Sequence, residues 1–509
     1  MLTSELTTMT RQPVRLAPRR WAALAALMLP VLLVSVDNTV LTFALPQIVT
    51  ALGPSGTQLL WIVDIYPLVM AGLLVPMGAL ADRFGRRRML FIGSIGFAAV
   101  SALAAFAPSG ALLVAARAGL GVFGAMLMPS TLSIIRNVFT DRRERRIAIA
   151  VWAAGFASGA ALGPIVGGAL LEHFWWGSVF LLAVPVLVVF LAAAPFALPE
   201  SRDPNGHSLD AASALMIIAA MLGVVYGIKT LAKNADPVVG IAALVAGIAV
   251  LGLFVWRQRV LTHPMIEMPL FKTGAFTGAV LINLLSIFSL IGFLFFASQD
   301  LQLVHGMRPM QAGLALLPGV LAMIVTGLTA APLARRIRPG YIIIAGLVSS
   351  GAGYATMAFS SGGLSVNAIV LAFALVAAGV GAAETISNDL ILSAVPSAKA
   401  GAASAISETA YELGTVLGTA ILGSILTASY TASLVAPAGL TSAQASAAQE
   451  TLGGATKVAQ DLPADLAEAL LASAHAAFDS GVTTTSTIGV ALSGAAVVLA
   501  LIAFRKVKA

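Results

Sequence analysis

Acidic residues interrupt apolar stretches of this 509-residue chain that are long enough to cross a bilayer. Asp37 is near the middle of one such stretch, which runs from Trp21 to Leu45. A carboxylate in hydrocarbon is energetically costly, so it usually faces a cavity, a proton path or a cation. Similar acids recur further along the chain, at Asp64, Glu384, Asp389, Glu408 and Glu412. Several such acids indicate a transporter of protons and positively charged cargo.

The composition places most of the chain in a membrane. Hydrophobic residues make up 59% and charged residues 10%, whereas a soluble domain carries about 25% charged residues. The chain has no cysteine, which excludes disulfides, thiolate metal sites and cysteine nucleophiles, and its five histidines show no metal-ligand spacing. The first apolar run continues past Asp37 and is too long for a cleavable signal, so we expect a retained span.

Fourteen apolar runs have the length of membrane-spanning helices. They predict an all-α integral membrane protein. The runs are 20–46, 57–79, 88–107, 110–137, 144–171, 175–198, 209–230, 237–256, 275–302, 310–334, 340–359, 364–393, 399–430 and 482–504.

The basic residues predict the orientation. With the N-terminus in the cytoplasm, the inward-facing segments hold 24 of the 29 lysines and arginines. The exceptions are Arg117, which lies within a span, and Lys229, Lys233, Arg308 and Lys457. This asymmetry follows the positive-inside rule and supports an even number of spans with both termini in the cytoplasm. The basic residues form no cluster on a soluble face, so we expect no nucleic-acid partner.

A weak internal repeat suggests the domain organisation. The loop after the second run reads Ala-Asp-Arg-Phe-Gly-Arg-Arg from Ala81, and the loop after the tenth, from Ala334, is a degraded echo of it. Two six-span halves would leave the seventh and eighth runs as an inserted pair. We therefore expect a tail at 1–19, an N-terminal bundle at 20–200, a linker with two inserted helices at 201–260 and a C-terminal bundle at 261–509. The outward loop 431–480 could form a short amphipathic helix or helical hairpin, or be a tolerated insertion.

The short loop after the second run carries a compact motif of glycine, acid and arginine. Its residues are Gly78, Asp82, Arg83, Gly85, Arg86 and Arg87. Gly78 allows close helix approach, and the basic cluster anchors the loop at the membrane surface. We predict a gating latch, although topology-determining charge alone would also explain the arginines. In the fifth run Gly155, Gly159, Gly163, Pro164 and Gly167 predict a flat helix face that could seal the two halves or simply pack.

Together these motifs resemble those of the major facilitator superfamily. With Asp37-Asn38-Thr39 and Trp61-Ile-Val-Asp64 they are most similar to its fourteen-span drug:proton antiporter branch, and within it to efflux pumps for quaternary ammonium compounds. The resemblance implies the major facilitator fold of two six-helix bundles plus two inserted helices. One position departs from the pattern, because Leu120 stands before Gly121 where a glutamine is frequent. The run Gly119-x-Gly121-x-x-Gly124 follows no strand, so we interpret it as helix packing and not as a dinucleotide site.

We assign expected roles to the embedded residues. For proton coupling they are Asp37, Asp389, Glu408, Glu412 and Arg117, since an arginine near Asp37 would change that acid's proton affinity. For cargo binding they are Asp37, Asp64 and Glu384, with the aromatic residues Tyr66, Phe288, Phe293, Phe295 and Tyr411 for cation–π contact. Asp300 lies near the outer boundary, where we expect it to reach water.

The expected activity is alternating-access export of lipophilic cations, including quaternary ammonium compounds, dyes and antiseptics, in exchange for protons. No P-loop is present, so the proton gradient is the expected energy source and no cofactor is expected. We expect a monomer in a bacterial inner membrane. The alternatives are export of a siderophore, lipid or amino acid, and uncoupled facilitation. A membrane hydrolase would need a nucleophile or metal cluster, and a sensor or scaffold an output domain, neither of which is recognisable.

Overall fold

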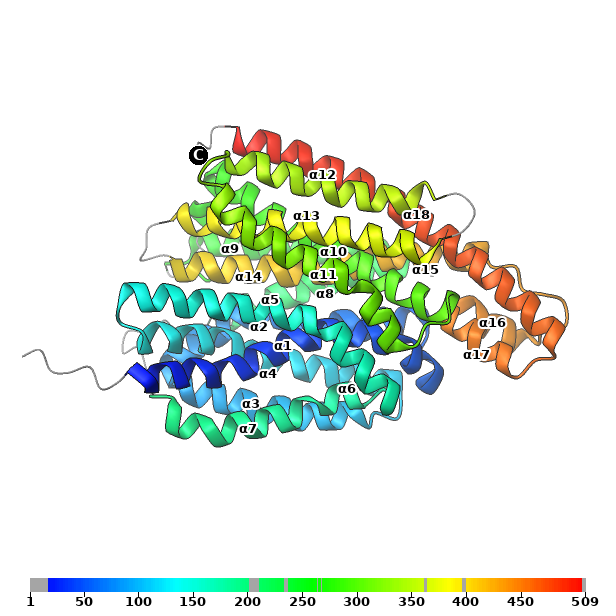
Figure 1. Cartoon of the computed structure of the whole chain (residues 1–509), viewed down its shortest axis with the longest axis horizontal. Helices are drawn as coiled ribbons and strands as arrows, with labels where there is room; N and C mark the ends of the chain where they lie inside the picture. The colour runs from blue at the N-terminus through cyan, green and yellow to red at the C-terminus, as the bar shows by residue number, and fades with distance from the viewer. Residues whose placement is uncertain are drawn as a thin grey trace, which may run out of the picture.

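A computed structural model describes residues 17–200, 210–232, 237–262, 264–266, 268–360, 364–395 and 400–505. Residues 1–16 of the expected tail and residues 201–209 of the expected linker lie outside these ranges. Over the described residues the chain is helical and contains no strand, as expected (Figure 1). Thirteen helices are long and apolar enough to cross a membrane, and the helix Arg142–His173 has the length of a fourteenth.

The first seven helices form the N-terminal group. They are α1 (Ala17–Leu52), α2 (Gly56–Phe84), α3 (Arg86–Ala105), α4 (Gly110–Val138), α5 (Arg142–His173), α6 (Ser178–Leu181) and α7 (Ala183–Ala197). In this group α1 packs against α5 and α7, and α2 and α3 pack against α4. The run expected at 175–198 is therefore split into α6 and α7, which meet at Leu182.

Local chemistry sets the ends of α2. Ser55 begins it with a capping box, in which its hydroxyl accepts from the Gln58 amide and the Gln58 side chain accepts from the Ser55 amide. Gly85 alone separates α2 from α3, and its φ of +109° is a backbone conformation that residues with a side chain rarely adopt. The turn between these two helices thus depends on a glycine.

The next two helices form a hairpin between the halves of the chain. In this pair α8 (Ala211–Ala232) and α9 (Pro237–Val260) lie against each other, and α8 also contacts α2 and α15. A Cβ on Gly227 would lie 2.8 Å from the Gly240 oxygen, so small residues allow the two backbones to approach closely.

The remaining helices form the C-terminal group, which includes two π-helical turns. They are η1 (Met268–Lys272), α10 (Gly274–Gln299), η2 (Asp300–Val304), α11 (Pro309–Leu333), α12 (Pro339–Ala358), α13 (Val366–Ser393), α14 (Ala400–Leu417), η4 (Gly418–Gly423), α15 (Ser424–Ser433) and α18 (Ala464–Phe504). Here α13 packs against α10, α11 and α12, and α18 packs against α12 and α15.

The segment expected to be a separate surface element is partly continuous with the last span. The short helices α16 (Ser442–Glu450) and α17 (Leu452–Gln460) do pair, but Leu466, Leu470 and Leu471 belong to α18, a single helix of 41 residues. The segment is therefore helical, as one of the two alternatives predicted, but residues 464–480 continue into the last span instead of forming a separate short helix. We call α16, α17 and the first turns of α18 the cap.

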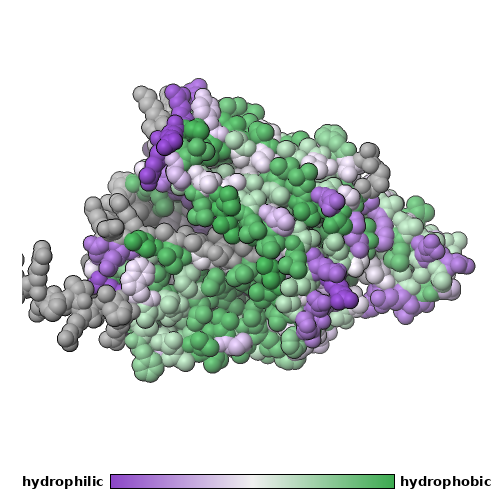
Figure 2. All heavy atoms as spheres, viewed as in Figure 1, coloured by the Kyte–Doolittle hydropathy of each residue, from purple (hydrophilic) through white to green (hydrophobic). Residues whose placement is uncertain are grey.

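The start of α1 and the end of α18 lie at one end of the molecule, opposite the cap (Figure 1). We call the first the terminal end and the second the distal end. Figure 2 shows a broad apolar surface with hydrophilic side chains towards the two ends. Phe196 (79% exposed) and Phe359 (78% exposed) are among the large apolar side chains left uncovered by protein. A surface of this kind suits lipid rather than water.

Side-chain contacts join the two groups near the distal end. The Ser298 hydroxyl donates to the Thr42 oxygen at 3.2 Å, and the Gln302 amide donates to the Phe43 oxygen at 3.2 Å. Arg308 and Glu172 form an exposed ion pair at 3.3 Å. The distal ends of the two groups are therefore closed against each other.

The helix α5 uses two faces. Cβ atoms at Gly159, Gly163 and Gly167 would collide with Ser35, Thr39 and Val40 of α1, so this face packs inside the N-terminal group, as the packing alternative expected. The other face meets the C-terminal group: a Cβ on Gly168 would lie 2.6 Å from the Met310 Cα of α11, and one on Gly313 of α11 would collide with the Pro164 oxygen. The close contact between the halves therefore involves Pro164 of the predicted motif and its neighbour Gly168.

Candidate functional site

Asp37 of α1 forms a buried ion pair with Arg117 of α4. The Arg117 Nη1 and Asp37 Oδ2 atoms are 2.7 Å apart, and the two residues are 2% and 6% exposed. The Arg117 Nε donates to the Ile62 oxygen at 3.1 Å, and the guanidinium lies 4.4 Å from the centre of the Tyr66 ring. Removing either partner of such a pair leaves an uncompensated buried charge, which typically costs 3–5 kcal/mol.

The glycines of α4 make this arrangement possible. A Cβ at Gly121 would lie 2.7 Å from the Tyr66 oxygen, and one at Gly124 would lie 3.3 Å from the Tyr66 ring. These glycines let α4 approach α2, which places Tyr66 under the Arg117 guanidinium. The interpretation of the glycine run as helix packing is confirmed.

Asp64 of α2 forms a second buried ion pair, with Lys229 of the inserted helix α8. The Lys229 Nζ is 2.8 Å from Asp64 Oδ2, and the side chains are 1% and 0% exposed. The ammonium also lies 4.0 Å from the centre of the Trp61 ring. The sequence analysis assigned no role to Lys229, because it counted this residue only as an exception to the positive-inside rule. Its position inside an apolar run was the signal that could have found it.

Three carboxylates of the C-terminal group lie close to one another without an ion pair among the described residues. Glu408 and Glu412 stand one turn apart on α14, and Glu384 of α13 is close enough to Glu408 for their charges to interact. Both oxygens of Glu412 are buried and lack a hydrogen-bond partner within the described ranges, as does Glu408 Oε1. Because like charges repel, three such acids favour holding protons or a cation.

Glu412 and two tyrosines connect this cluster to the N-terminal pair. Glu412 is close enough to Arg117 for their charges to interact. The Tyr66 hydroxyl likewise lies within electrostatic range of the Asp37 and Glu412 carboxylates. Tyr411 lies within range of Glu384, Glu408 and Glu412. The structure therefore brings seven predicted residues together across the boundary between the two groups. They are Asp37, Tyr66, Arg117, Glu384, Glu408, Tyr411 and Glu412.

Asp389 does not join this set. It is exposed in the penultimate turn of α13, towards the terminal end, and forms no ion pair in the part of the chain that is described.

The predicted phenylalanines occupy the core of the C-terminal group. Phe293 packs against Phe296, Tyr354 and Phe373, with ring centres 4.7, 5.6 and 5.9 Å apart. Phe295 is 3% exposed and lies against Gly423. These two residues therefore do not line the charged region.

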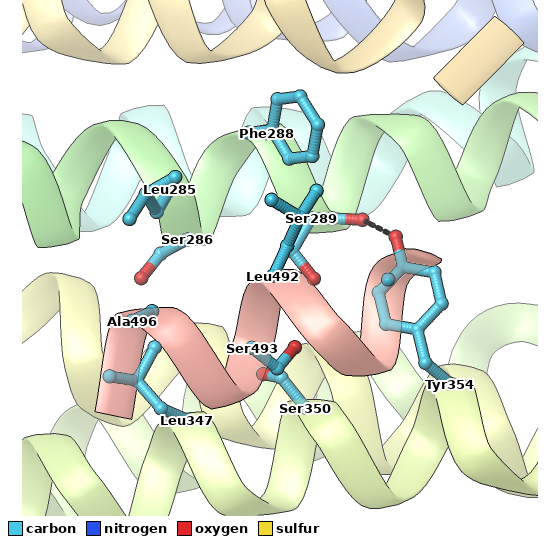
Figure 3. A pocket seen from close by; sticks show the side chains of 11 residues that line it. Leu285, Ser286, Phe288, Ser289, Leu347, Ser350, Tyr354, Leu492, Ser493 and Ala496 are labelled. Atoms are coloured by element: carbon cyan, nitrogen blue, oxygen red, sulfur yellow. Dashed lines mark hydrogen bonds between the residues drawn. The ribbon is translucent and has the colours of Figure 1, made fainter. Parts of the chain in front are cut away.

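Phe288 borders a small cavity between α10, α12 and α18. Figure 3 shows Ser286, Ser289, Ser350 and Ser493 around it, with the Tyr354 hydroxyl donating to the Ser289 oxygen at 2.6 Å. Its volume of about 20 Å³ has room for roughly one water, so it is too small for an organic cation.

The loop motif makes its described contacts inside the N-terminal group. Asp82 accepts from the Arg86 Nε at 2.8 Å. The Arg87 side chain donates to the Leu198 oxygen and its amide to Glu200, both at 3.2 Å, while Arg83 lies over the Phe84 ring. A Cβ on Gly78 would lie 3.5 Å from the Pro129 Cβ of α4. In this state the motif joins α2, α3 and the end of α7, and no contact with the C-terminal group is among those described.

Asp300 is buried, contrary to the expectation that it reaches water. It is 0% exposed, and the His305 Nδ1 is 2.9 Å from its Oδ1. The hydrogen bond that His305 donates to the Asp300 carboxylate raises the pKa of His305 above its ordinary value. The π-helical turn of η2 produces this contact by placing residues five apart on one side of the helix.

The acids and histidines of the described chain form no cluster of three that could hold a metal ion. Their observed partners are arginine, lysine, histidine and one another. Buried carboxylates with such partners have the chemistry to exchange protons or bind cations.

Comparison with known proteins agrees with this geometry. Residues 27–419 match the model of the Major Facilitator Superfamily. The chain is 53% identical to the multidrug efflux pump LfrA of Mycolicibacterium smegmatis, over 98% of this chain and 99% of that protein. It is 37% identical to the methyl viologen resistance protein SmvA of Salmonella typhimurium, over 90% of this chain and 93% of that protein.

Solved structures share the fold at much lower identity. A bacterial homolog to the human lysosomal transporter Spinster, in its inward-facing and unoccupied conformation, superposes with a TM-score of 0.65. The match covers 96% of this chain and 98% of that protein at 17% identity. At this identity the likeness establishes the fold alone.

Proposed function

Because this chain belongs to the Major Facilitator Superfamily, we propose that it exports lipophilic cations in exchange for protons by alternating access. At the coarser level it is a drug-efflux transporter of a bacterial membrane and not an enzyme. The relatives LfrA and SmvA support this cargo class, since methyl viologen, which SmvA's name carries, is an organic dication.

One observation carries the proposal. The buried Asp37–Arg117 pair lies within charge range of Glu412, on the other side of the boundary between the two groups. When the groups separate and close, the surroundings of these charges must change, and with them the carboxylates' affinity for protons. A conformational change can thereby load or release a proton.

The proposed cycle rests on competition. Deprotonated acids bind the cationic drug on the cytoplasmic side, and protons taken up outside neutralise the acids and release it. Because proton and cation compete for the same carboxylates, exchange needs no separate coupling device. Moving one charge across about 100 mV is worth about 2.3 kcal/mol, so the proton gradient can drive the cycle without a cofactor.

We further propose the orientation and organisation of the protein. The basic residues favour an inner-membrane protein with both termini in the cytoplasm. The distal end would then face outward, and the contacts that close it would correspond to a state shut towards the outside. Two six-helix bundles, at 20–200 and 261–509, with the helix pair of 201–260 between them, would move as the two halves of a monomer. Asp389, exposed towards the terminal end, could pass protons to the cytoplasm.

Transport in reconstituted liposomes tests this proposal. Purified protein would be given an imposed pH gradient, ethidium or methyl viologen as cargo, and an internal pH dye as readout. We expect cation movement to require the gradient and to carry protons in the opposite direction. Transport that persists after an ionophore collapses the gradient would indicate a facilitator. Competition by a siderophore, lipid or amino acid, with no effect of cations, would assign another cargo.

A further inference from the structure

Lys229 is a lysine buried inside a membrane-spanning helix. It lies in α8, a membrane-spanning helix of the inserted pair, and its side chain is 1% exposed. A lysine in hydrocarbon is costly and is tolerated when a partner or a cavity offsets the cost. Its partner, Asp64, belongs to the N-terminal group, so the pair joins the inserted helices to the transport core.

The Lys229 ammonium is held by charge and by an aromatic face. Its Nζ is 2.8 Å from Asp64 Oδ2 and 4.0 Å from the Trp61 ring centre. Despite the short distance, neither Lys229 Nζ nor the Asp64 oxygens make a well-directed hydrogen bond within the described ranges. An ammonium has three donors, so this one is less satisfied than it would be in water. A carboxylate beside an aromatic face is also the arrangement that holds quaternary and other organic cations.

A pocket leads to this ammonium. It has a volume of about 200 Å³ and lies between α2, α8, α15 and α16. Lys229, Leu60 and Thr57 line it, together with Ser424, Thr427 and Glu450. Lys229 therefore borders a cavity that also reaches a second carboxylate, Glu450 of the cap.

We propose that Lys229 is a built-in competitor of the cargo, occupying the cation place between Asp64 and Trp61 whenever no drug is bound there. Cargo binding at this place is an exchange of one cation for another. Asp64 thus keeps a positive partner in both the empty and the loaded carrier, which avoids the large cost of an unpaired buried charge. Only cations that interact with Asp64 and Trp61 better than the lysine can enter, so the inserted helix pair contributes to selectivity. This inference rests on the proposed function, because it presumes a cationic cargo.

Cation binding to purified variants tests the exchange. Ethidium binding would be followed by fluorescence at mildly alkaline pH for wild type, Lys229→Met and Lys229→Arg. Loss of the competitor should tighten binding in Lys229→Met by roughly tenfold, whereas Lys229→Arg, which keeps the charge, should stay close to wild type. The gain should vanish in the double variant Lys229→Met/Asp64→Asn, because no carboxylate then remains to be freed. Lys272→Met, at an exposed lysine, is the matched control and should bind like wild type.

Chemical labelling gives a readout that does not depend on transport or on a variant. An amine-reactive reagent should modify Lys272 at all times, but Lys229 only when saturating ethidium has displaced it, as mass spectrometry of peptides would show. A static structural ion pair predicts a protected Lys229 under both conditions and weaker or equal binding in Lys229→Met. A Lys229 that stays protected, together with no tighter binding by Lys229→Met and normal ethidium binding by wild type, overturns the inference and leaves the proposed function intact. Absence of ethidium binding to wild type overturns both.

Discussion

The carboxylates of the two helix groups are neutralised in different ways. In the N-terminal group Asp37 and Asp64 each contact a fixed cation, Arg117 and Lys229, at less than 3 Å. In the C-terminal group Glu384, Glu408 and Glu412 form no ion pair among the described residues, and their nearest charged neighbours include one another. The two halves share a fold but not a charge arrangement.

This difference separates two tasks that the proposed exchange of cations for protons requires. A carboxylate in contact with a permanent cation is already neutralised, so a competing cation has to displace that partner. A carboxylate without one must acquire a proton or a cargo charge to be stable in a buried place. Within the proposed competition of proton and cation, the N-terminal acids therefore favour cation binding and the C-terminal acids favour protonation. The predictions below test this division, from the largest expected effect to the smallest.

Asp37→Asn should abolish proton-coupled export of dications. The substitution removes the charge at the centre of the site and leaves Arg117 buried without its partner, which typically costs 3–5 kcal/mol. Liposome transport with a pH dye measures the loss. Because an unpaired Arg117 destabilises the protein, the double variant Asp37→Asn/Arg117→Gln serves as a folded control, and it should remain inactive. Efflux at the wild-type rate in either variant would contradict a role for Asp37.

Glu412→Gln should reduce proton release more than cation binding. Removing one member of the unpaired cluster lowers the proton affinity of the remaining acids, and one pKa unit corresponds to about 1.4 kcal/mol, or tenfold. We expect coupled transport to fall roughly tenfold while ethidium still binds. Glu408→Gln is the matched variant one turn away. If either one abolishes cation binding but leaves proton release intact, the division between the halves is wrong.

Gly168→Ala should slow transport several-fold, because its Cβ would lie 2.6 Å from the Met310 Cα and force the two groups apart. Overpacking of this kind typically costs 1–3 kcal/mol. Gly155→Ala is a matched control on the same helix, since its Cβ meets only the mobile end of Met28 in the same group. Equal effects of the two variants would show that the contact between the groups is not limiting.

His305→Gln should have the smallest effect, confined to stability and dependent on pH. The pKa of His305 is raised above its unfolded value of 6.5, so the ion pair with Asp300 stabilises fully below about that pH. The stabilisation is lost as the pH rises through the raised folded pKa. We expect the variant to lose about 1 kcal/mol of unfolding free energy at acidic pH and less at alkaline pH, which thermal unfolding across pH would measure. A difference independent of pH would contradict this partner for Asp300.

The sequence predicted the membrane spans and most of the acids that the structure brings together, because a carboxylate inside an apolar run is easy to recognise. It also predicted that Arg117 lies near Asp37, which the structure confirms. It could not predict the partner of Asp64, since Lys229 lies far away in the chain and on a helix outside the two repeats. Such contacts depend on how helices pack, which hydrophobic periodicity does not determine.

Two further residues differ from their expected surroundings for local physical reasons. Asp300 was expected to reach water because it lies near the outer boundary, but it is buried and the π turn of η2 brings His305 to it. Phe293 was expected at the cargo site because aromatic residues bind cations, and in this structure its ring packs against Tyr354 and Phe373, so its role in cargo binding stays a prediction. Residue type alone does not distinguish these two environments.

The unbroken length of α18 has a mechanical consequence. At 1.5 Å per residue its 41 residues form a rod about 60 Å long, which carries the cap at one end and packs against α12 and α15 along its course. The cap in turn rests on the opposite half, where Lys457 donates to the Thr50 oxygen at 2.6 Å and Glu450 accepts from the Gly56 amide at 3.0 Å. In the proposed cycle, rocking of the halves would therefore move the cap, and a nanobody or an engineered crosslink that fixes the cap to the N-terminal group should stop transport.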